Sequence, residues 1–223
     1  MTARTRAEPP LALTLDAAFA AKGVTARLGC LAFSVPGRRG DLGPALDAAA
    51  VRVRETPLAE VAPIQATRRA YKALGKDPSR YRPASEALWR RLQKGEAPPR
   101  IHDLVDLNTL ISLETGLAAG IYDRRHLAPP LHYRVGLPGE TYPAIGGQEA
   151  FNLTGLPLLA DREGPFGSPT RDGARARVRA DTAEALLVLF AFDMPDLPGA
   201  LSMAQNAVER YMLATEVDVW QVA

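Results

Sequence analysis

The segment from Arg68 to Arg91 constrains the fold most, because it combines turn chemistry with a local excess of positive charge. It holds eight Arg or Lys residues against two acidic residues, so its net charge is +6, whereas the whole chain carries only +2. Gly75 stands where a helix commonly stops, and the Lys-Asp-Pro-Ser run that follows is typical of a turn. Pro83 suits the first turn of a second helix. The segment is therefore predicted to form two basic helices joined by a turn.

Aromatic residues interleave with the cations of this segment: Tyr71, Tyr81 and Trp89. Cations mixed with aromatic rings can bind phosphates and stack bases, so one interpretation is a surface for RNA. The alternative is a solvated amphipathic helix pair whose aromatic residues belong to the core. The charge pattern taken alone favours this second interpretation, because such faces are common on ordinary helices.

The composition is that of a globular protein with a sizeable core, since 47% of the 223 residues are hydrophobic and 23% are charged. This length allows one large domain or two small ones. No apolar run is long enough for a transmembrane helix, and the N-terminal stretch lacks the apolar region of a secretory signal. The single cysteine, Cys30, lies in an apolar run and is predicted to be a small buried residue. A cytoplasmic location without a membrane partner is expected.

The rest of the chain predicts strands and helices mixed without a regular βαβ alternation. The predicted strands cover residues 24–35, 117–123, 131–135, 141–145, 156–161, 174–179, 186–192 and 217–222. The other predicted helices cover residues 16–23, 41–55, 101–115 and 197–214. Residues 1 to about 9 are predicted to be a frayed tail, and residues 36–40 and 163–173 to be loops. This order predicts an α+β fold in one domain, 1–223, with its core at about 25–192 and the last helix and strand packed on it.

The helix predicted over 101–115 is apolar nearly all the way round and should be largely buried. Asp106 and Asn108 lie within it, so they need hydrogen-bond partners or a cavity. Asn108 could bond a strand end, or it could position a water or a substrate amine in a pocket. Asp106 could likewise simply cap a loop.

The motifs of several enzyme classes are missing. The chain has no G-x-S-x-G, Walker A or G-x-G-x-x-G run, so an elbow serine nucleophile and the standard nucleotide loops are not predicted. Its three histidines show neither H-E-x-x-H spacing nor a cysteine cluster, so neither a metal site nor a cofactor is expected. The remaining polar candidates are Tyr122, Asp123, Glu140, Ser168, Thr170 and Asp172.

Four runs of the sequence carry a family resemblance: ALGKDPSRYRPASEALWRR (73–91), VDLN (105–108), GIYD (120–123) and LADREGPFGSPTRD (159–172). They resemble free-standing relatives of the editing domain in the beta chain of bacterial phenylalanyl-tRNA synthetase, the B3/4 domain family. The likeness spans residues 25 to 192 approximately. It implies an α+β layered β/β/α sandwich of mixed sheet with flanking helices, and a pocket between sheet and helix.

The resemblance also implies where a site would lie. Asn108 matches the pocket asparagine of the family, and Asp106 beside it is the second catalytic candidate. The implied substrate-binding residues are Gly120, Tyr122, Asp123, Gly167, Ser168 and Thr170. The expected RNA contacts on the basic segment are Lys76, Arg80, Arg82 and Arg90.

The chain departs from the synthetase domain at two positions. The synthetase has a histidine where Gly120 stands, and its strand with a recognition glutamate here reads LLVLFAF (186–192), without an acid. Specificity for tyrosine is therefore not expected.

These features lead to three functional hypotheses. The first is a stand-alone protein that binds aminoacylated tRNA and hydrolyses a wrongly attached amino acid from it, without a cofactor, as a monomer or small homo-oligomer. The second is a non-catalytic module that binds RNA or an amino-acid-like ligand. The third is a structural partner of a synthetase or the ribosome.

Overall fold

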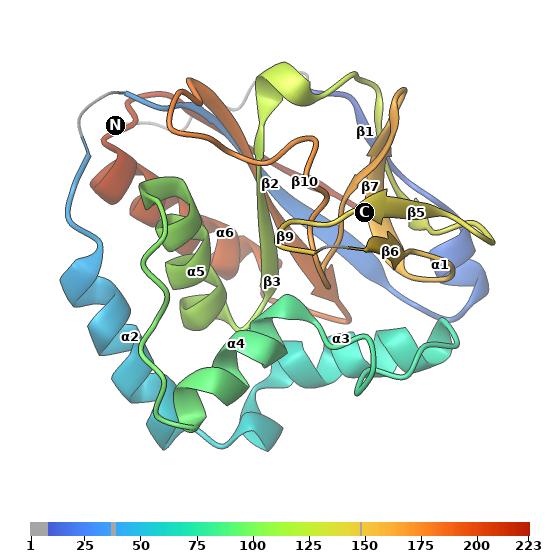
Figure 1. Cartoon of the computed structure of the whole chain (residues 1–223), viewed down its shortest axis with the longest axis horizontal. Helices are drawn as coiled ribbons and strands as arrows, with labels where there is room; N and C mark the ends of the chain where they lie inside the picture. The colour runs from blue at the N-terminus through green and yellow to red at the C-terminus, as the bar shows by residue number, and fades with distance from the viewer. Residues whose placement is uncertain (1–8, 37–38, 148) are drawn as a thin grey trace.

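The computed structural model describes residues 9–36, 39–147 and 149–223, which form a layered α+β structure (Figure 1). Two four-stranded sheets pack against each other, and helices cover the outer face of one of them. The predicted fold class, a β/β/α sandwich with a mixed sheet, is confirmed.

The middle layer is an antiparallel sheet in the order β10-β2-β9-β3. Its strands are β2 (Ala26–Ser34), β3 (Ala118–Asp123), β9 (Glu184–Phe192) and β10 (Val217–Val222). All residues of β9 except the first are buried, which explains the unbroken apolar run in its sequence. Its side chains alternate between two cores: Ala185, Leu187, Leu189 and Ala191 face the helices, while Leu186, Val188, Phe190 and Phe192 face the second sheet.

The second sheet has the order β1-β4-β7-β8, and its β1–β4 pair is parallel while the other pairs are antiparallel. Its strands are β1 (Leu13–Leu15), β4 (Leu131–Val135), β7 (Pro157–Asp161) and β8 (Gly164–Gly167). A separate hairpin of β5 (Thr141–Pro143) and β6 (Ala150–Asn152) packs on β7 through a third, small core. Buried aromatic rings fill the space between the two large sheets: Phe19, Tyr71, Tyr122, Tyr133, Phe166 and Phe190.

Helices α2 (Gly43–Glu55), α4 (Ala84–Gln93), α5 (Asp103–Thr115) and α6 (Leu197–Ala207) form the outer layer, as Figure 1 shows. A π-helical turn (Val208–Met212) extends α6, two 3-10 turns follow Pro57 (Leu58–Glu60) and Asp123 (Arg124–His126), and α1 (Ala18–Ala21) is a single turn. Helix α3 (Ala62–Ala73) runs along the lower end of the layers in Figure 1 and contributes to both cores. Within the described ranges, no helix has the length and apolarity needed to cross a bilayer.

Most predicted elements are confirmed, but two expectations are wrong and the type of helix at the end of a third element differs. Residues 174–179 form no strand, because they meet the sheet only through single bridges such as Tyr122–Arg177. The loop predicted over 163–173 contains β8, whose Gly- and Pro-rich sequence hid it. The α-helical part of 197–214 ends at Ala207. The tail predicted over residues 1–9 lies, except for residue 9, outside the described residues, as do residues 37 and 38 of the 36–40 loop. Cys30 is buried, as expected.

The two basic helices are α3 and α4, and Gly75 has the predicted left-handed conformation between them, at φ +79°. Of the interleaved aromatic residues, Tyr71 and Trp89 belong to the cores, as the alternative interpretation held, whereas Tyr81 is only partly buried. Helix α4 also buries the carboxylate of Glu86 completely.

Three arginines surround this buried carboxylate. Arg68 Nη1 lies 2.8 Å from both oxygens of Glu86, and Arg90 Nε lies 2.8 Å from Oε1. Arg82 Nε lies 3.7 Å from the same oxygen. A buried charge needs such compensation, so Glu86 ties α3, the turn and α4 together.

Replacing Glu86 with Ala should lower the free energy of unfolding by about 2–4 kcal/mol, because the charge network loses its shared acceptor. Urea unfolding monitored by circular dichroism measures this. The control is Glu96→Ala, which removes the half-exposed partner of Arg91 and should cost about 0–1 kcal/mol. Equal losses in the two variants would contradict the organising role of Glu86.

Candidate functional site

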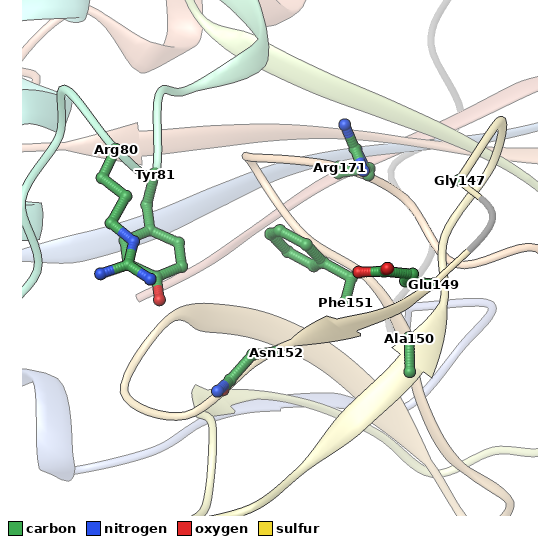
Figure 2. A pocket seen from close by; sticks show the side chains of 8 residues that line it. All are labelled: Arg80, Tyr81, Gly147, Glu149, Ala150, Phe151, Asn152 and Arg171. Carbon is green, nitrogen blue, oxygen red and sulfur yellow. The ribbon is translucent and has the colours of Figure 1, made fainter.

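A pocket of about 470 Å³ opens where the turn between α3 and α4, the β5–β6 hairpin and the loop after β8 meet (Figure 2). Its lining residues are Arg80, Tyr81, Gly147, Glu149, Ala150, Phe151, Asn152 and Arg171. Figure 2 shows the guanidinium of Arg80 beside the ring of Tyr81 on one side, with Phe151 and Arg171 across from them. Segments far apart in the sequence therefore build one cationic and aromatic pocket.

A cationic side chain lies over each of the two aromatic rings that line this pocket, Tyr81 and Phe151. The Arg80 guanidinium carbon lies 5.6 Å from the centroid of the Tyr81 ring, and Lys76 Nζ lies 4.9 Å from it. The Arg171 guanidinium carbon lies 5.5 Å from the Phe151 centroid. These distances fit cation–π contacts, which hold flexible side chains in place at a surface. Of the RNA contacts predicted from sequence, Lys76 and Arg80 lie here, whereas Arg82 and Arg90 contact Glu86 instead.

The loop of residues 168–172, which carries Arg171 to the pocket, is held by three tyrosine hydroxyls. Tyr71 and Thr170 share a hydrogen bond of 2.7 Å between their hydroxyl groups. Tyr122 donates to the carboxylate of Asp172 at 2.7 Å, and Tyr142 donates to the carbonyl of Arg171. Because Tyr71 and Tyr122 are fully buried, the loop is anchored to the core between the sheets.

The loop is also braced from within by Ser168. Its hydroxyl donates to the carbonyl of Arg171 at 2.8 Å, and its N–H donates to Asp172 at 3.2 Å. Ser168 and Thr170, predicted to bind substrate, thus have partners that shape the loop. Neither residue lines the pocket.

Two glycines make room for the phenol of Tyr122. A Cβ atom at Gly120 would lie 2.1 Å from the Tyr122 hydroxyl oxygen, and one at Gly167 would lie 2.2 Å from it. The Tyr122 ring also packs edge-on against Phe166, with centroids 5.0 Å apart. The structure therefore brings the predicted residues Gly120, Tyr122 and Gly167 together in one cluster between the sheets.

Asp172 is the carboxylate of this cluster, and burial raises its pKa to about 6. The hydrogen bonds from the Tyr122 hydroxyl and the Ser168 N–H act in the opposite direction but do not offset burial. Asp172 can therefore gain and lose a proton near neutral pH.

Asp123 has the surroundings of a structural acceptor. Burial works against its charge, but hydrogen bonds from Arg125 and Thr182 outweigh burial and lower its pKa to about 2. It also accepts from the Arg125 backbone N–H, at the start of the 3-10 turn. Glu140 similarly pairs with Arg134, and this hydrogen bond lowers the pKa of Glu140.

Asn108 and Asp106, the predicted catalytic residues, lie on α5 and do not line the pocket of Figure 2. Asn108 Nδ2 donates to the carbonyl of Ala119 in β3 at 3.1 Å, while its Oδ1 is buried and has no hydrogen-bond partner among the described residues. Asp106 accepts from the N–H of Ile101 at 2.9 Å, so it caps the segment before the helix.

Among the other buried polar atoms without a partner in the described ranges are Ser85 Oγ and Trp89 Nε1. Both lie on α4, one turn apart, and α4 contacts both α5 and β3. Asn108 Oδ1, Ser85 Oγ and Trp89 Nε1 are thus three unpartnered polar atoms on two helices that contact each other and β3, and a water or a polar ligand could satisfy each of them.

Several residues that line the pocket were not predicted from the sequence as site residues. Phe151 and Asn152 lie on a three-residue strand whose sequence has no marker of a site. Arg171 stands inside the LADREGPFGSPTRD run, so the family resemblance was the available signal. In the described part of the chain, no group of three or more metal-ligating side chains gathers.

Comparison with known proteins adds two similarities. The model of the B3/4 domain family matches residues 66–215. A crystal structure of an N-terminal fragment of the phenylalanyl-tRNA synthetase beta-subunit from Pyrococcus horikoshii is similar over 100% of this chain, with a TM-score of 0.54 and 14% identity. The chain spans 54% of that fragment, and at this identity the likeness shows the fold alone. No curated protein sequence matches the chain.

Replacing Gly167 with Ala should destabilise the protein by about 1–3 kcal/mol, because the new methyl group collides with the buried Tyr122 ring. Gly147→Ala is the control, since its Cβ would meet no atom closer than 3.5 Å. Urea unfolding of both variants measures the difference. Similar stabilities would show that the ring moves aside at little cost.

Asp172 should make stability depend on pH. Between the ordinary aspartate pKa of 3.8 and the folded-state pKa of about 6, the folded chain holds a proton that the unfolded chain has released, so stability falls as pH rises through this range. Asp172→Asn keeps an oxygen acceptor for Tyr122 and Ser168 but cannot titrate. From about pH 4 to about pH 7.5, the wild type should therefore lose about 1–3 kcal/mol relative to this variant in urea unfolding. A difference in unfolding free energy between the wild type and Asp172→Asn that does not change with pH would contradict the raised pKa of Asp172.

Proposed function

Because the chain belongs to the B3/4 domain family, we propose that it binds aminoacylated tRNA and removes a wrongly attached amino acid in trans. The structural likeness to a fragment of the phenylalanyl-tRNA synthetase beta-subunit supports tRNA as the substrate. The chemistry proposed is hydrolysis of the ester between the amino acid and the terminal ribose.

The observation that carries this proposal is the pocket of Figure 2, where cations and aromatic rings from three segments face one opening. RNA binding needs positive charge for the phosphates and flat rings for unpaired bases. Lys76 and Arg80 supply the charge from the basic segment, and Arg171 supplies it from the loop. The outer parts of Arg82 and Arg90 remain 43% and 44% exposed beside Glu86, so they extend this cationic surface along α4.

The proposed place for the ester is the junction of α4, α5 and β3. Asn108 Nδ2 already donates to Ala119, so the free capacity of the side chain is its acceptor Oδ1. This oxygen can hold the attacking water or the substrate ammonium group. The developing oxyanion then needs backbone N–H donors, and the neighbouring ribose hydroxyl of the tRNA assists the proton transfer. Asp106 supports the site indirectly by fixing the start of α5.

Mischarged tRNAs bearing different amino acids should be deacylated by the wild-type protein, and Asn108→Ala should slow the reaction about 100-fold because the water or substrate loses its positioning acceptor. The assay measures the loss of radiolabelled amino acid from the tRNA. Asn206→Ala, at an exposed position of α6, is the matched control and should keep the wild-type rate. Absence of turnover with every mischarged tRNA, or full activity of Asn108→Ala, would overturn the catalytic proposal.

A non-catalytic RNA-binding module is the second candidate. It is favoured by the lack of an acidic side chain on β9 beyond the exposed Glu184 at its start, and by glycine at position 120. In this case, Asn108→Ala retains the full salt-dependent affinity for tRNA, and no variant changes a hydrolysis rate.

A further inference from the structure

The aromatic residues of the pocket differ from those of the cores in their exposure. Tyr71, Tyr122 and Tyr133 are completely buried, whereas Tyr81 and Phe151 are only partly buried and line an opening. Aromatic rings left accessible on a pocket wall are typical of sites that stack a flat ligand, because each ring can still lose water-exposed area on binding.

The guanidinium groups of the pocket also differ from the other arginines nearby. Arg68, Arg82 and Arg90 share the carboxylate of Glu86. Arg80 and Arg171 are exposed, and neither forms an ion pair with a carboxylate among the described residues. Their charge is therefore available to an anionic ligand such as a phosphate.

Hydrogen-bonding groups complete the pocket. Asn152 Oδ1 accepts from the Thr154 N–H at 2.9 Å, which leaves its Nδ2 as the donor side of the amide. Glu149, which also lines the pocket, adds a carboxylate acceptor. A nucleobase offers both acceptors and donors along its edge, so an amide donor and a carboxylate acceptor match its chemistry.

The pocket is also formed in advance of binding. Three tyrosine hydroxyls fix the loop that carries Arg171, and Tyr81 N–H donates to the carbonyl of Asp77 within the turn. Gly155, at φ +70°, leaves room for Lys76. A Cβ atom at residue 155 would lie only 2.8 Å from Lys76 Cε. Pre-organised walls lower the entropy cost of binding.

We propose that this pocket binds one unpaired nucleotide, with its base against Tyr81 and the Phe151–Arg171 pair and its phosphate at Arg80 and Arg171. The inference rests on the proposed function for its source, which is one of the unpaired nucleotides that precede the esterified 3′ end of an RNA. A free mononucleotide has the same chemistry, so the test separates the two sources.

The test is fluorescence anisotropy of a 5′-labelled, uncharged six-nucleotide RNA with the full-length protein. Tyr81→Leu and Phe151→Leu should each weaken binding about 5- to 100-fold. Arg171→Ala should weaken binding and reduce its salt dependence by about one charge. Tyr211→Leu is the matched control, because Tyr211 is also partly buried and lies outside the pocket, with the Arg210 guanidinium carbon 5.2 Å from its ring centroid. This variant should bind the RNA with an affinity within about twofold of the wild-type value.

A second RNA of the same length in which every residue is abasic separates stacking from charge. The affinity of the wild type for this abasic RNA should be as low as the affinity of Tyr81→Leu for the intact RNA. The affinity of Tyr81→Leu for the abasic RNA should be no lower still. Equal binding of the intact and abasic RNAs, or unchanged binding by both leucine variants when circular dichroism shows them folded, would overturn the proposal.

Competition by AMP identifies the source. If AMP displaces the RNA at concentrations near its own dissociation constant, the site takes a free nucleotide; if only oligonucleotides compete, it takes an RNA end. Since the RNA is uncharged, the result does not depend on hydrolysis. Failed deacylation with normal RNA binding contradicts the proposed function and leaves this inference standing. Deacylation together with RNA binding that does not depend on Tyr81 and Phe151 contradicts this inference and leaves the proposed activity standing.

Discussion

Burial of both faces of β9 is the constraint on which the architecture depends. A strand with one face against helices and the other against a second sheet has no surface for water, so its neighbours must supply two separate cores. β2 and β3 pair on either side of it and continue these cores. The alternation of side chains along β3 then directs Ala119 and Ile121 toward the helices and Tyr122 toward the second sheet.

That alternation places the two candidate regions on opposite faces of one strand. On the helix side, Asn108 bonds the carbonyl of Ala119. On the other side, Tyr122 fills the space above Gly120 and holds the loop that carries Arg171. The edge strand β3 therefore contacts both Asn108 of α5, through the carbonyl of Ala119, and the loop that carries Arg171, through Tyr122.

The sequence predicted the parts of the fold whose signals are local. The apolar run of β9, the glycine ends of α3 and α5 and the terminal edge strand all depend on nearest neighbours in the chain, and they were correctly placed. β8 was missed because its stability comes from pairing with β7, and its Gly-Pro sequence has no strand preference of its own. The Glu86–Arg90 pair was visible at i,i+4 spacing, but Arg68 reaches the same carboxylate only through tertiary packing. For the site, the resemblance supplied the residues around Tyr122, whereas Phe151 comes from a short hairpin that no local pattern marks.

The close fit of Tyr122 against two glycines also restricts the order in which this sequence can change. A side chain at position 120 and the phenol at position 122 would occupy the same volume, as would a side chain at position 167. A lineage that exchanges glycine for a larger residue at either position must first shorten residue 122, and doing so releases the Asp172 carboxylate from its hydrogen bond. Substitutions at these three positions are therefore coupled, and a larger side chain at position 120 or 167 is expected to cost stability unless residue 122 changes with it.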